Sequence, residues 1–291
     1  MLAQQIANGL VLGSIYALSA LGFTLIFGAA RVVNFAYGEV LMLGAFFTVT
    51  LVTVLDVNFF VALPIAMAGI AVLSVVLFYT TLRPVMQGSF TSLHSELQII
   101  LVTLGLLYVL HEGAILIWGT APRSLEMGIE GVLIVGDVVM TYKRLVVIGI
   151  MILLVGCLYW LLYRTKIGKA LRAIAQNREG ANAIGLNADR IVAFVFAVSG
   201  AMACAAGSLL GTLYAVDSTM GSGPILKSFV IVIFGGLGSV PGAIVGGLVI
   251  GLIETLGGAY ISFAFKDVFT FLALIAMLLL RPAGLFGRAA A

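Results

Sequence analysis

Residues 231–256 read IVIFGGLGSVPGAIVGGLVIGLIETL. The stretch is apolar and carries a single charged residue, Glu254. Glycine frees the backbone and proline removes a helical hydrogen bond, so the cluster GGLGSVPG (235–242) predicts an interruption of the helix. The glycines at 242, 246, 247 and 251 have the spacing that lets membrane helices approach closely. The stretch therefore predicts a broken membrane helix whose parts pack tightly against their neighbours.

The whole chain has the composition of an integral membrane protein. Of its 291 residues, 62% are hydrophobic and 9% are charged, whereas soluble domains are nearer half apolar and about a quarter charged. A net charge of +3, spread along the chain, gives no signature of nucleic-acid binding. The two cysteines lie in apolar runs, so we expect reduced thiols rather than a disulfide framework or a metal site.

Hydrophobic runs of spanning length recur along the chain. Because lipid offers no hydrogen-bond partners, each spanning backbone must be helical. We therefore predict an all-α, polytopic helical membrane protein of about eight to nine passes, in one domain over 1–291, with short or broken helices near 28–38 and 235–242. The region 225–281 is expected to hold three passes, the first two shortened. The other spans are predicted at 6–27, 38–55, 60–80, 97–118, 145–163 and 191–213. The first run is long enough to span and lacks a basic start, so we expect no cleavable signal peptide.

The distribution of basic residues predicts the orientation. The loop 164–190 is the richest in lysine and arginine and should be cytoplasmic. Successive loops alternate between the two sides of the membrane, which assigns five of the 15 basic residues to the outside and the other ten to the inside. The amino terminus is then outside and the carboxyl terminus in the cytoplasm. The outside set is Arg123, Lys143, Arg144, Lys227 and Lys266. The longest external loop, about 119–143, contains two β-prone runs around Gly136-Asp137, which predicts a hairpin that either docks a soluble partner or caps helix ends.

Several residues are candidates for a translocation path. The segment NFAYGE (34–39) places Asn34, Tyr37 and Glu39 at a predicted membrane boundary, where an ionisable group suggests a pathway or a partner. The alternative is an interfacial turn in which Glu39 caps the next helix. Broken helices in transporters often face the substrate route, which adds Gly235, Gly236, Gly238 and Pro241 and is favoured over a purely structural helical hairpin. Glu254 is either a pathway residue, an interhelical residue or a residue near the external interface.

Catalytic and nucleotide-binding signatures are missing from the sequence. It contains no GxxxxGK[ST], HExxH or GxSxG motif. We therefore expect a transport subunit rather than an enzyme, with no cofactor or metal of its own. Any energy from ATP would come from a partner.

The segment TKIGKALRAIAQNREGANAIGLNADR (165–190) gathers an unusual share of the charge. Ala170, Leu171, Ile174 and Ala175 fall on one helical face, so we predict a short amphipathic helix followed by a turn. The segment could anchor the chain by its positive charge, bind anionic lipid head groups, or fit as a rigid knob into a soluble partner. The helical face and the length of the segment favour the third interpretation.

EGANAIG (179–185) resembles the EAAxxxG coupling loop of bacterial ABC-importer permeases, with Gly180 in place of the usual alanine. A closer resemblance is to the branched-chain amino-acid permeases of the LivH type. It extends in order over nearly the whole chain. The segments that carry it are NGLVLGSIYALSALGFTLIFG (8–28), VNFAYGE (33–39), LRAIAQNREGANAIGLN (171–187), GGLGSVPGAIVGG (235–247) and RPAGLFG (281–287).

The resemblance implies one subunit of a heteromeric importer in the bacterial inner membrane. Its expected partners are a LivM-like permease subunit, two cytoplasmic ABC ATPases that bind the ATP, and a periplasmic amino-acid-binding protein. The resemblance further implies a coupling helix that touches an ATPase and contains Arg172, Arg178, Glu179, Ala181 and Gly185. The candidates Asn34, Tyr37 and Glu39 match the family's second signature.

Two alternatives stay open at the level of sequence. One is a self-sufficient secondary transporter or channel, which would usually carry intramembrane acids for the driving ion. The other keeps the ABC architecture but carries urea, short amides or other small amino acids.

Overall fold

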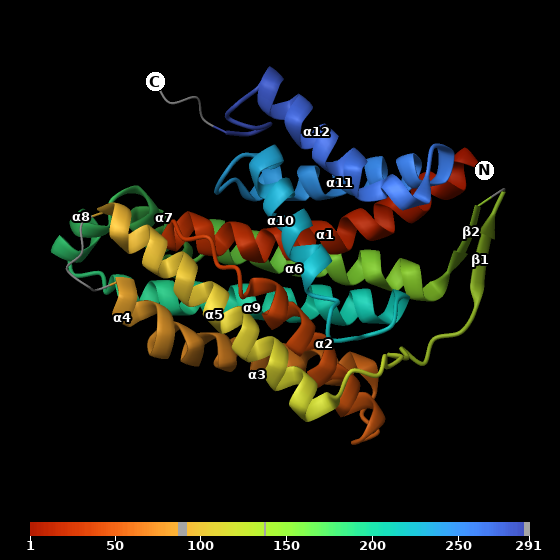
Figure 1. Cartoon of the computed structure of the whole chain (residues 1–291), viewed down its shortest axis with the longest axis horizontal. Coiled ribbons are helices and arrows are strands. Elements are labelled where there is room, and N and C mark those ends of the chain that lie inside the picture. The colour runs from red at the N-terminus through yellow and green to blue at the C-terminus, as the bar shows by residue number, and fades with distance from the viewer. Residues whose placement is uncertain (87–91, 137, 288–291) are drawn as a thin grey trace.

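The chain folds into a bundle of long helices, described by a computed structural model over residues 1–86, 92–136 and 138–287 (Figure 1). The helices are α1 (Leu2–Ala30), α2 (Tyr37–Thr53), α3 (Phe59–Leu77), a π-helical turn (Phe78–Leu82), α4 (Arg83–Met86), α5 (Ser92–Trp118), α6 (Tyr142–Arg164), α7 (Lys166–Gln176), α8 (Arg178–Ala183), α9 (Ala188–Leu213), α10 (Ser222–Gly235), α11 (Val240–Tyr260), a 3-10 turn (Phe263–Phe265) and α12 (Lys266–Leu280). Two strands, β1 (Val132–Val135) and β2 (Val138–Thr141), form the described sheet.

The predicted fold class is confirmed. Among the described residues, seven helical segments are long and apolar enough to cross a membrane, and α2 and α10 are shorter apolar helices. One detail of the prediction is wrong. The first two passes of the region 225–281 were both expected to be short, but only α10 is short. α10 has 14 residues, whereas α11 has 21 and continues through Gly257 and Gly258 to Tyr260. A glycine that stays in a helical conformation weakens the helix without ending it.

α1 runs through the middle of the bundle and packs mainly against α11 and α9 (Figure 1). α1 and α11 approach each other closely because small residues lie where the two helices cross. The backbone of Gly251 lies against Gly13, and that of Gly247 lies against Ala17, with no room for a side chain on either glycine. This confirms the close packing predicted from the glycine spacing.

α9 is the second deeply buried helix and packs on α2 and α3. Gly207 faces the carbonyl oxygen of Leu41, and Gly44 of α2 faces the backbone of Cys204. The small-residue face of α9 therefore serves packing. The thiol of Cys204 is buried and reduced, whereas Cys157 is exposed.

The two ends of the bundle differ in composition. The first end, called the hairpin end, holds the amino terminus and β1–β2 (Figure 1). The strands pair antiparallel from Val132↔Thr141 to Val135↔Val138, which confirms the predicted hairpin, although Asp137 of its turn lies outside the described residues. Gln4 ties the hairpin to α1, because its side chain donates to the Val139 carbonyl oxygen (2.9 Å) and accepts from the Val139 amide (2.7 Å).

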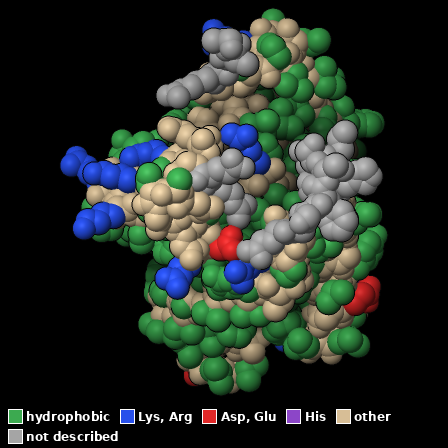
Figure 2. Space-filling view, turned by 90° about the vertical axis from the view of Figure 1, so that its left-hand side faces the viewer, with side chains coloured by type: hydrophobic (Ala, Val, Ile, Leu, Met, Phe, Trp, Pro, Cys, Tyr) green, Lys and Arg blue, Asp and Glu red, His purple; other side chains and the backbone are tan. Residues whose placement is uncertain are grey.

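The opposite end, called the basic end, carries α7, α8 and the last described residues of the chain (Figure 1). Lysine and arginine side chains gather there on one protruding element (Figure 2). The side chain of Arg83 pairs with Asp189 at 2.9 Å and joins α4 to α9. Lys227, which the count of basic residues assigns to the outside, lies within α10, where its side chain is 12% exposed.

Candidate translocation and coupling sites

The first candidate site lies where the chain turns from α1 into α2. Asn34, Tyr37 and Glu39 are brought together there, and all three are buried. Asn34 Oδ1 accepts a hydrogen bond from the Ala36 amide (3.1 Å), and the Tyr37 hydroxyl donates to the Ser19 carbonyl oxygen (2.8 Å). Because Ser19 lies in the middle of α1, α2 begins in the interior of the bundle and not at its end.

Glu39 lies in the first turn of α2 but no side chain forms a capping hydrogen bond with that helix. Its carboxylate oxygen Oε2 lies 3.4 Å from Nδ1 of His111 on α5. A carboxylate in the first turn is stabilised by the helix dipole. The structure therefore places Glu39 in a buried contact with α5. His111 stood alone in the sequence and gave no signal of this contact.

The two short helices start at the same place. Gly38 of α2 and Gly221, which precedes α10, lie backbone against backbone, and a Cβ atom on Gly38 would come within 2.6 Å of the Gly221 carbonyl oxygen. Nearby, the hydroxyls of Ser19 and Ser228 share a buried hydrogen bond of 2.7 Å. α1, α2 and α10 thus meet at one polar, closely packed point inside the bundle.

The second break separates α10 from α11. Gly236 and Gly238 adopt φ of 101° and 79°, which favour glycine, and the Ser239 hydroxyl then caps α11 by accepting from the Gly242 amide at 3.1 Å. Pro241 fits the first turn of α11, where its missing N–H breaks no helical bond. Gly235 packs on the backbone of Gly242.

The carboxyl-terminal signature RPAGLFG (281–287) holds this break in place. The Leu285 amide donates to the Phe234 carbonyl oxygen (2.9 Å), and the Phe286 amide donates to the Gly235 carbonyl oxygen (3.0 Å). Gly236 and Gly284 are also in backbone contact. The break is thus a fixed feature of the fold, stabilised by a segment that lies about 50 residues away in the sequence.

The break opens onto a cavity of about 610 Å³ at the basic end. α1 contributes Thr24 and Gly28 to its lining, and the break contributes Gly238 and Pro241. The end of α6 and the segment 165–190 contribute further lining residues, including Arg172. Residues predicted for two different roles, translocation and coupling, therefore share one cavity.

The segment 165–190, with α7 and α8, forms a knob on the basic end. Leu171 and Ile174 of α7 are buried, which confirms the predicted amphipathic face. Gly168 lets α7 turn tightly against the Leu162 carbonyl oxygen of α6. The Arg172 guanidinium donates to that same oxygen (2.9 Å) and stacks over the Tyr163 ring at 5.2 Å.

The turn after α7 is built on short-range contacts. Ala181 of α8 is buried in a small cluster with Ile174 and Ala188, and Gly185 ends the turn with φ of 87°. Asn177 caps α8 through the Gly180 amide (2.9 Å). The side chains of Arg178 and Glu179 lie outside the described residues, so their predicted contacts stay a prediction.

Glu254 lies apart from these residues, in the half of the bundle nearer the hairpin end. It is 3% exposed and its Oε1 accepts from Lys227 Nζ (2.6 Å) and from the Tyr16 hydroxyl (3.3 Å). Lys227 Nζ also lies 3.1 Å from Asp267 Oδ1 and donates to the Tyr16 hydroxyl (2.7 Å). Glu254 is therefore an interhelical residue that links α1, α10, α11 and α12. Sequence reasoning missed the pairing of Lys227 with Glu254, because the sequence does not show that their two helices face each other.

These features define a class: a polytopic helical membrane protein with two interrupted helices and a basic, structured knob at one end. Residues 5–278 match the family model described as branched-chain amino acid transport system / permease component. The chain belongs to this family.

Three relatives align over 98% of this chain and 95% of their own length. They are the high-affinity branched-chain amino acid transport system permease proteins BraD of Pseudomonas aeruginosa (30% identical), LivH of Salmonella typhimurium (32%) and LivH of Escherichia coli strain K12 (31%).

Proposed function

We propose that this chain is a membrane-spanning subunit of an ATP-driven ABC importer for branched-chain and other hydrophobic amino acids. A LivM-like permease subunit would complete the translocation path, two cytoplasmic ATPases would supply the energy, and a periplasmic binding protein would deliver the substrate. The importer would lie in the bacterial inner membrane, with the basic end and the carboxyl terminus in the cytoplasm. Membership of the permease family and the transport systems to which the relatives belong support this assignment.

The observation that carries the coupling role is the shared cavity at the basic end. Arg172 on the knob and Gly238 and Pro241 at the break line the same space. A force applied to the knob would reach the break through packed helices, because α7 is fixed to α6 by the Arg172 hydrogen bond and by the close packing of Gly168, and α7 also contacts α1, which packs on α10 and α11. Interfaces that shift as rigid bodies are an established means of switching between conformations.

Charge reversal on the knob tests this coupling role. In the importer reconstituted with its ATPases and binding protein, Arg172→Glu should insert and assemble but lose most of the leucine-stimulated ATP hydrolysis. The Leu162 carbonyl oxygen would then face a carboxylate instead of a donor. Gly185→Val should act similarly, because φ of 87° is strained for a β-branched residue.

Arg164→Glu is the matched control, since it reverses a charge at the same end, at the last residue of α6 and outside the basic-end cavity. Leucine uptake and ATP hydrolysis that stay at the control level in Arg172→Glu and Gly185→Val would refute the coupling role. Leucine uptake by the purified chain alone, without any ATPase, would overturn the proposed function in favour of a secondary transporter or channel.

A further inference from the structure

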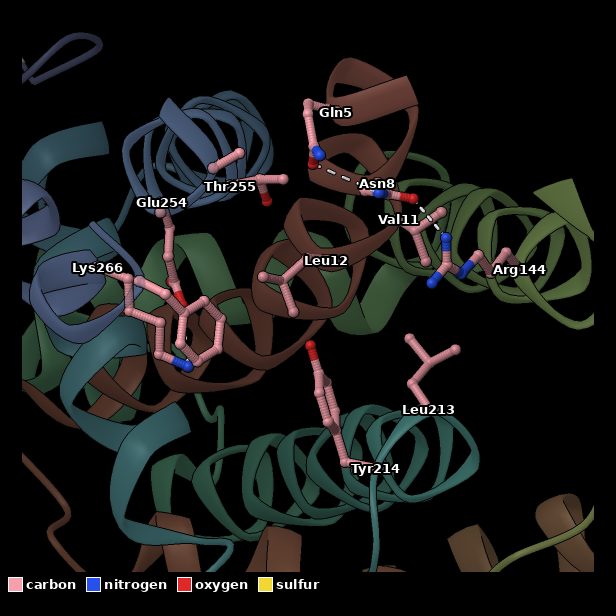
Figure 3. A pocket seen from close by; sticks show the side chains of 13 residues that line it. Gln5, Asn8, Val11, Leu12, Arg144, Leu213, Tyr214, Glu254, Thr255 and Lys266 are labelled. Atoms are coloured by element: carbon pink, nitrogen blue, oxygen red, sulfur yellow. Dashed lines mark hydrogen bonds and ion pairs between the residues drawn. The ribbon is translucent and has the colours of Figure 1, made fainter. Parts of the chain in front are cut away.

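Most acidic side chains in the spanning helices have a basic partner within the bundle. At the hairpin end, Glu254 of α11 and Arg144 of α6 line a cavity of about 360 Å³, called the hairpin-end cavity, with Leu12 of α1 between them (Figure 3). The ion pairs of the spans are Glu254 with Lys227 and Lys266, Asp267 with Lys227, and Asp189 with Arg83. Each of these carboxylates is therefore compensated by a residue of the same chain.

Glu112 of α5 differs from these acids. It lies in the span Leu97–Trp118, is exposed on the outside of the bundle, and has neither a hydrogen bond nor an ion pair with any described residue. Ionisable groups in a span normally face the bundle interior or pair with another polar group, because an unpaired one is costly in hydrocarbon. The exposure of Glu112 therefore indicates that something other than lipid covers this position.

Glu112 lies inside the apolar surface and not at its rim. Trp118, the last residue of α5, follows six residues later, or about 9 Å along the helix. Trp118 Nε1 donates to Thr50 Oγ1 at 2.7 Å, and the chain of α2 continues past this contact to the exposed Val54 and Leu55. α5 runs from the basic end toward the hairpin end (Figure 1), and helical side chains lean toward the amino terminus of their helix. The Glu112 carboxylate therefore leans away from the water at the hairpin end.

The rest of this helix face is apolar. It is called the α5 outer face and comprises Leu101, Gly105, Tyr108, Val109, Glu112 and Leu116, which recur at helical spacing. Its four large apolar side chains are 66–86% exposed. A Cβ atom on Gly105 would meet nothing within 4 Å. Gly105 and Glu112 are seven residues apart, which is the repeat of helices that pack side by side. The face thus combines a hydrogen-bonding group with a position where another helix can approach closely.

The outer face of α6 provides a comparison. Gly149 and Gly156 are also open to the outside, beside Ile152 and Leu153, which are each 63% exposed. Residues 145–163 contain no charged side chain, so lipid alone satisfies this face. An open glycine therefore does not distinguish a protein contact from a lipid-facing surface, whereas the unpaired Glu112 does.

We propose that the α5 outer face packs against a transmembrane helix of the second permease subunit. That helix approaches most closely at Gly105 and donates a hydrogen bond to Glu112 from a hydroxyl, amide or basic side chain. The inference rests on the proposed function, which requires a second membrane subunit. Lipid, or a helix with apolar side chains alone, would leave the Glu112 carboxyl group unpaired, so the donor fixes both the kind of partner and its register.

The test compares the lipid exposure of α5 in the purified chain and in the assembled permease pair, both in lipid nanodiscs. A nitroxide on Val109→Cys reports on the α5 outer face, and a nitroxide on Leu153→Cys of α6 is the matched control. Cys157→Ser removes the exposed native thiol, whereas Cys204 is buried. Dissolved oxygen collides freely with a lipid-facing label and poorly with one covered by protein. Oxygen collisions with the Val109 label should fall severalfold on assembly, and those with the Leu153 label should not change.

Two substitutions test the contact itself. Glu112→Leu removes the hydrogen-bonding group and Gly105→Ile fills the approach, and each should lower copurification with the second subunit severalfold. The purified single chain should elute normally with either change, because both positions are exposed. Glu112→Gln should retain assembly, since its amide oxygen still accepts a hydrogen bond. Gly149→Ile is the matched control, because a Cβ atom there also meets nothing within 4 Å.

Oxygen collisions with the Val109 label that do not change on assembly would overturn the interface. Copurification of Glu112→Leu and Gly105→Ile at the level of Gly149→Ile would do the same. A Val109 label that is already protected in the purified chain alone would overturn the second subunit as the occupant and assign the face to a second copy of this chain.

ATP-driven leucine uptake by the complete importer separates this inference from the proposed function. Uptake by an importer in which the Val109 label stays exposed to lipid refutes the interface and leaves the proposed function standing. Protection of the label in a permease pair that shows no ATP-driven uptake supports the interface and refutes the proposed function.

Discussion

Replacing Lys227 by methionine should destabilise the bundle more than replacing Glu254 by glutamine, although the two residues form one ion pair of 2.6 Å. Lys227→Met leaves the Glu254 carboxylate buried at 3% exposure, with Lys266 at 3.9 Å as its remaining cation among the described residues. Removing one partner of a buried pair costs about 3–5 kcal/mol, because a buried charge is left uncompensated. We expect Lys227→Met to lower the free energy of unfolding by about that amount.

Glu254→Gln should cost less. Lys227 then keeps Asp267 at 3.1 Å and the Tyr16 hydroxyl at 2.7 Å, and the new amide oxygen still accepts a hydrogen bond. A loss of roughly 1–3 kcal/mol follows from a weakened hydrogen bond to a charged group. The double variant should lie within about 2 kcal/mol of the unmodified protein, since replacing both members of a buried pair is often nearly neutral.

The assay is reversible unfolding of the purified chain in mixed micelles with increasing SDS. It gives the free energy of unfolding of the unmodified protein, the two single variants and the double variant, which together form a double-mutant cycle. The expected coupling energy between the two sites is at least about 2 kcal/mol. Lys266→Met serves as the control for loss of a nearby cation and should change stability little, since its side chain is 36% exposed. Additivity of the two single variants within ~0.5 kcal/mol would refute the argument that the pair is energetically coupled.

Three further substitutions test the packing and the breaks. Gly247→Val should prevent stable packing of α11 on α1, because its Cβ would overlap the Ala17 backbone. The control Gly156→Val, on the exposed face of α6, should elute as a normal monodisperse peak in size-exclusion chromatography, whereas Gly247→Val should not. Gln4→Ala should speed hydrogen exchange in 132–141 at least severalfold, since both hydrogen bonds from Gln4 to Val139 are lost; unchanged exchange would mean that the hairpin is held by other contacts. Ser239→Ala should cost about 0.5–2 kcal/mol as the loss of the α11 cap, with Ser239→Asp retaining stability in the same SDS titration.

How far the sequence predicts this structure depends on the range of the signal. The amphipathic face of α7 was predictable because Leu171 and Ile174 recur at helical spacing within a few residues. The break at 235–242 was predictable for the same reason, since its glycines and proline act on their own backbone. The length of α11 was not predictable, because glycine at 257 and 258 is compatible with both a helix and a turn, and the contact between Gly257 and the Phe269 ring joins segments that are not adjacent in the sequence.

Contacts between distant segments carried no local signal. Lys227 lies at the sixth position of a short helix, and a count of basic residues assigns it to one side of the membrane without indicating its contact with Glu254. Glu39 and His111 were each visible, but their separation of 3.4 Å results from the bundle, not from either motif. The hairpin-end cavity likewise needs α1, α6 and α11 side by side before Arg144 and Glu254 face the same space.

The two interrupted helices act as one mechanical unit. At one end, α10 starts in backbone contact with the start of α2 through Gly221 and Gly38. At its other end, the Phe234 and Gly235 carbonyl oxygens are bonded to the segment 281–287, beside the cavity that Arg172 lines. Because helices transmit displacement as stiff bodies and glycine contacts leave no compressible side chain between backbones, we expect a shift of the basic end of α10 to move the Gly38–Gly221 contact as well. The glycines therefore make the connection that α10 forms between the segment 281–287 and the interior of the bundle rigid rather than flexible.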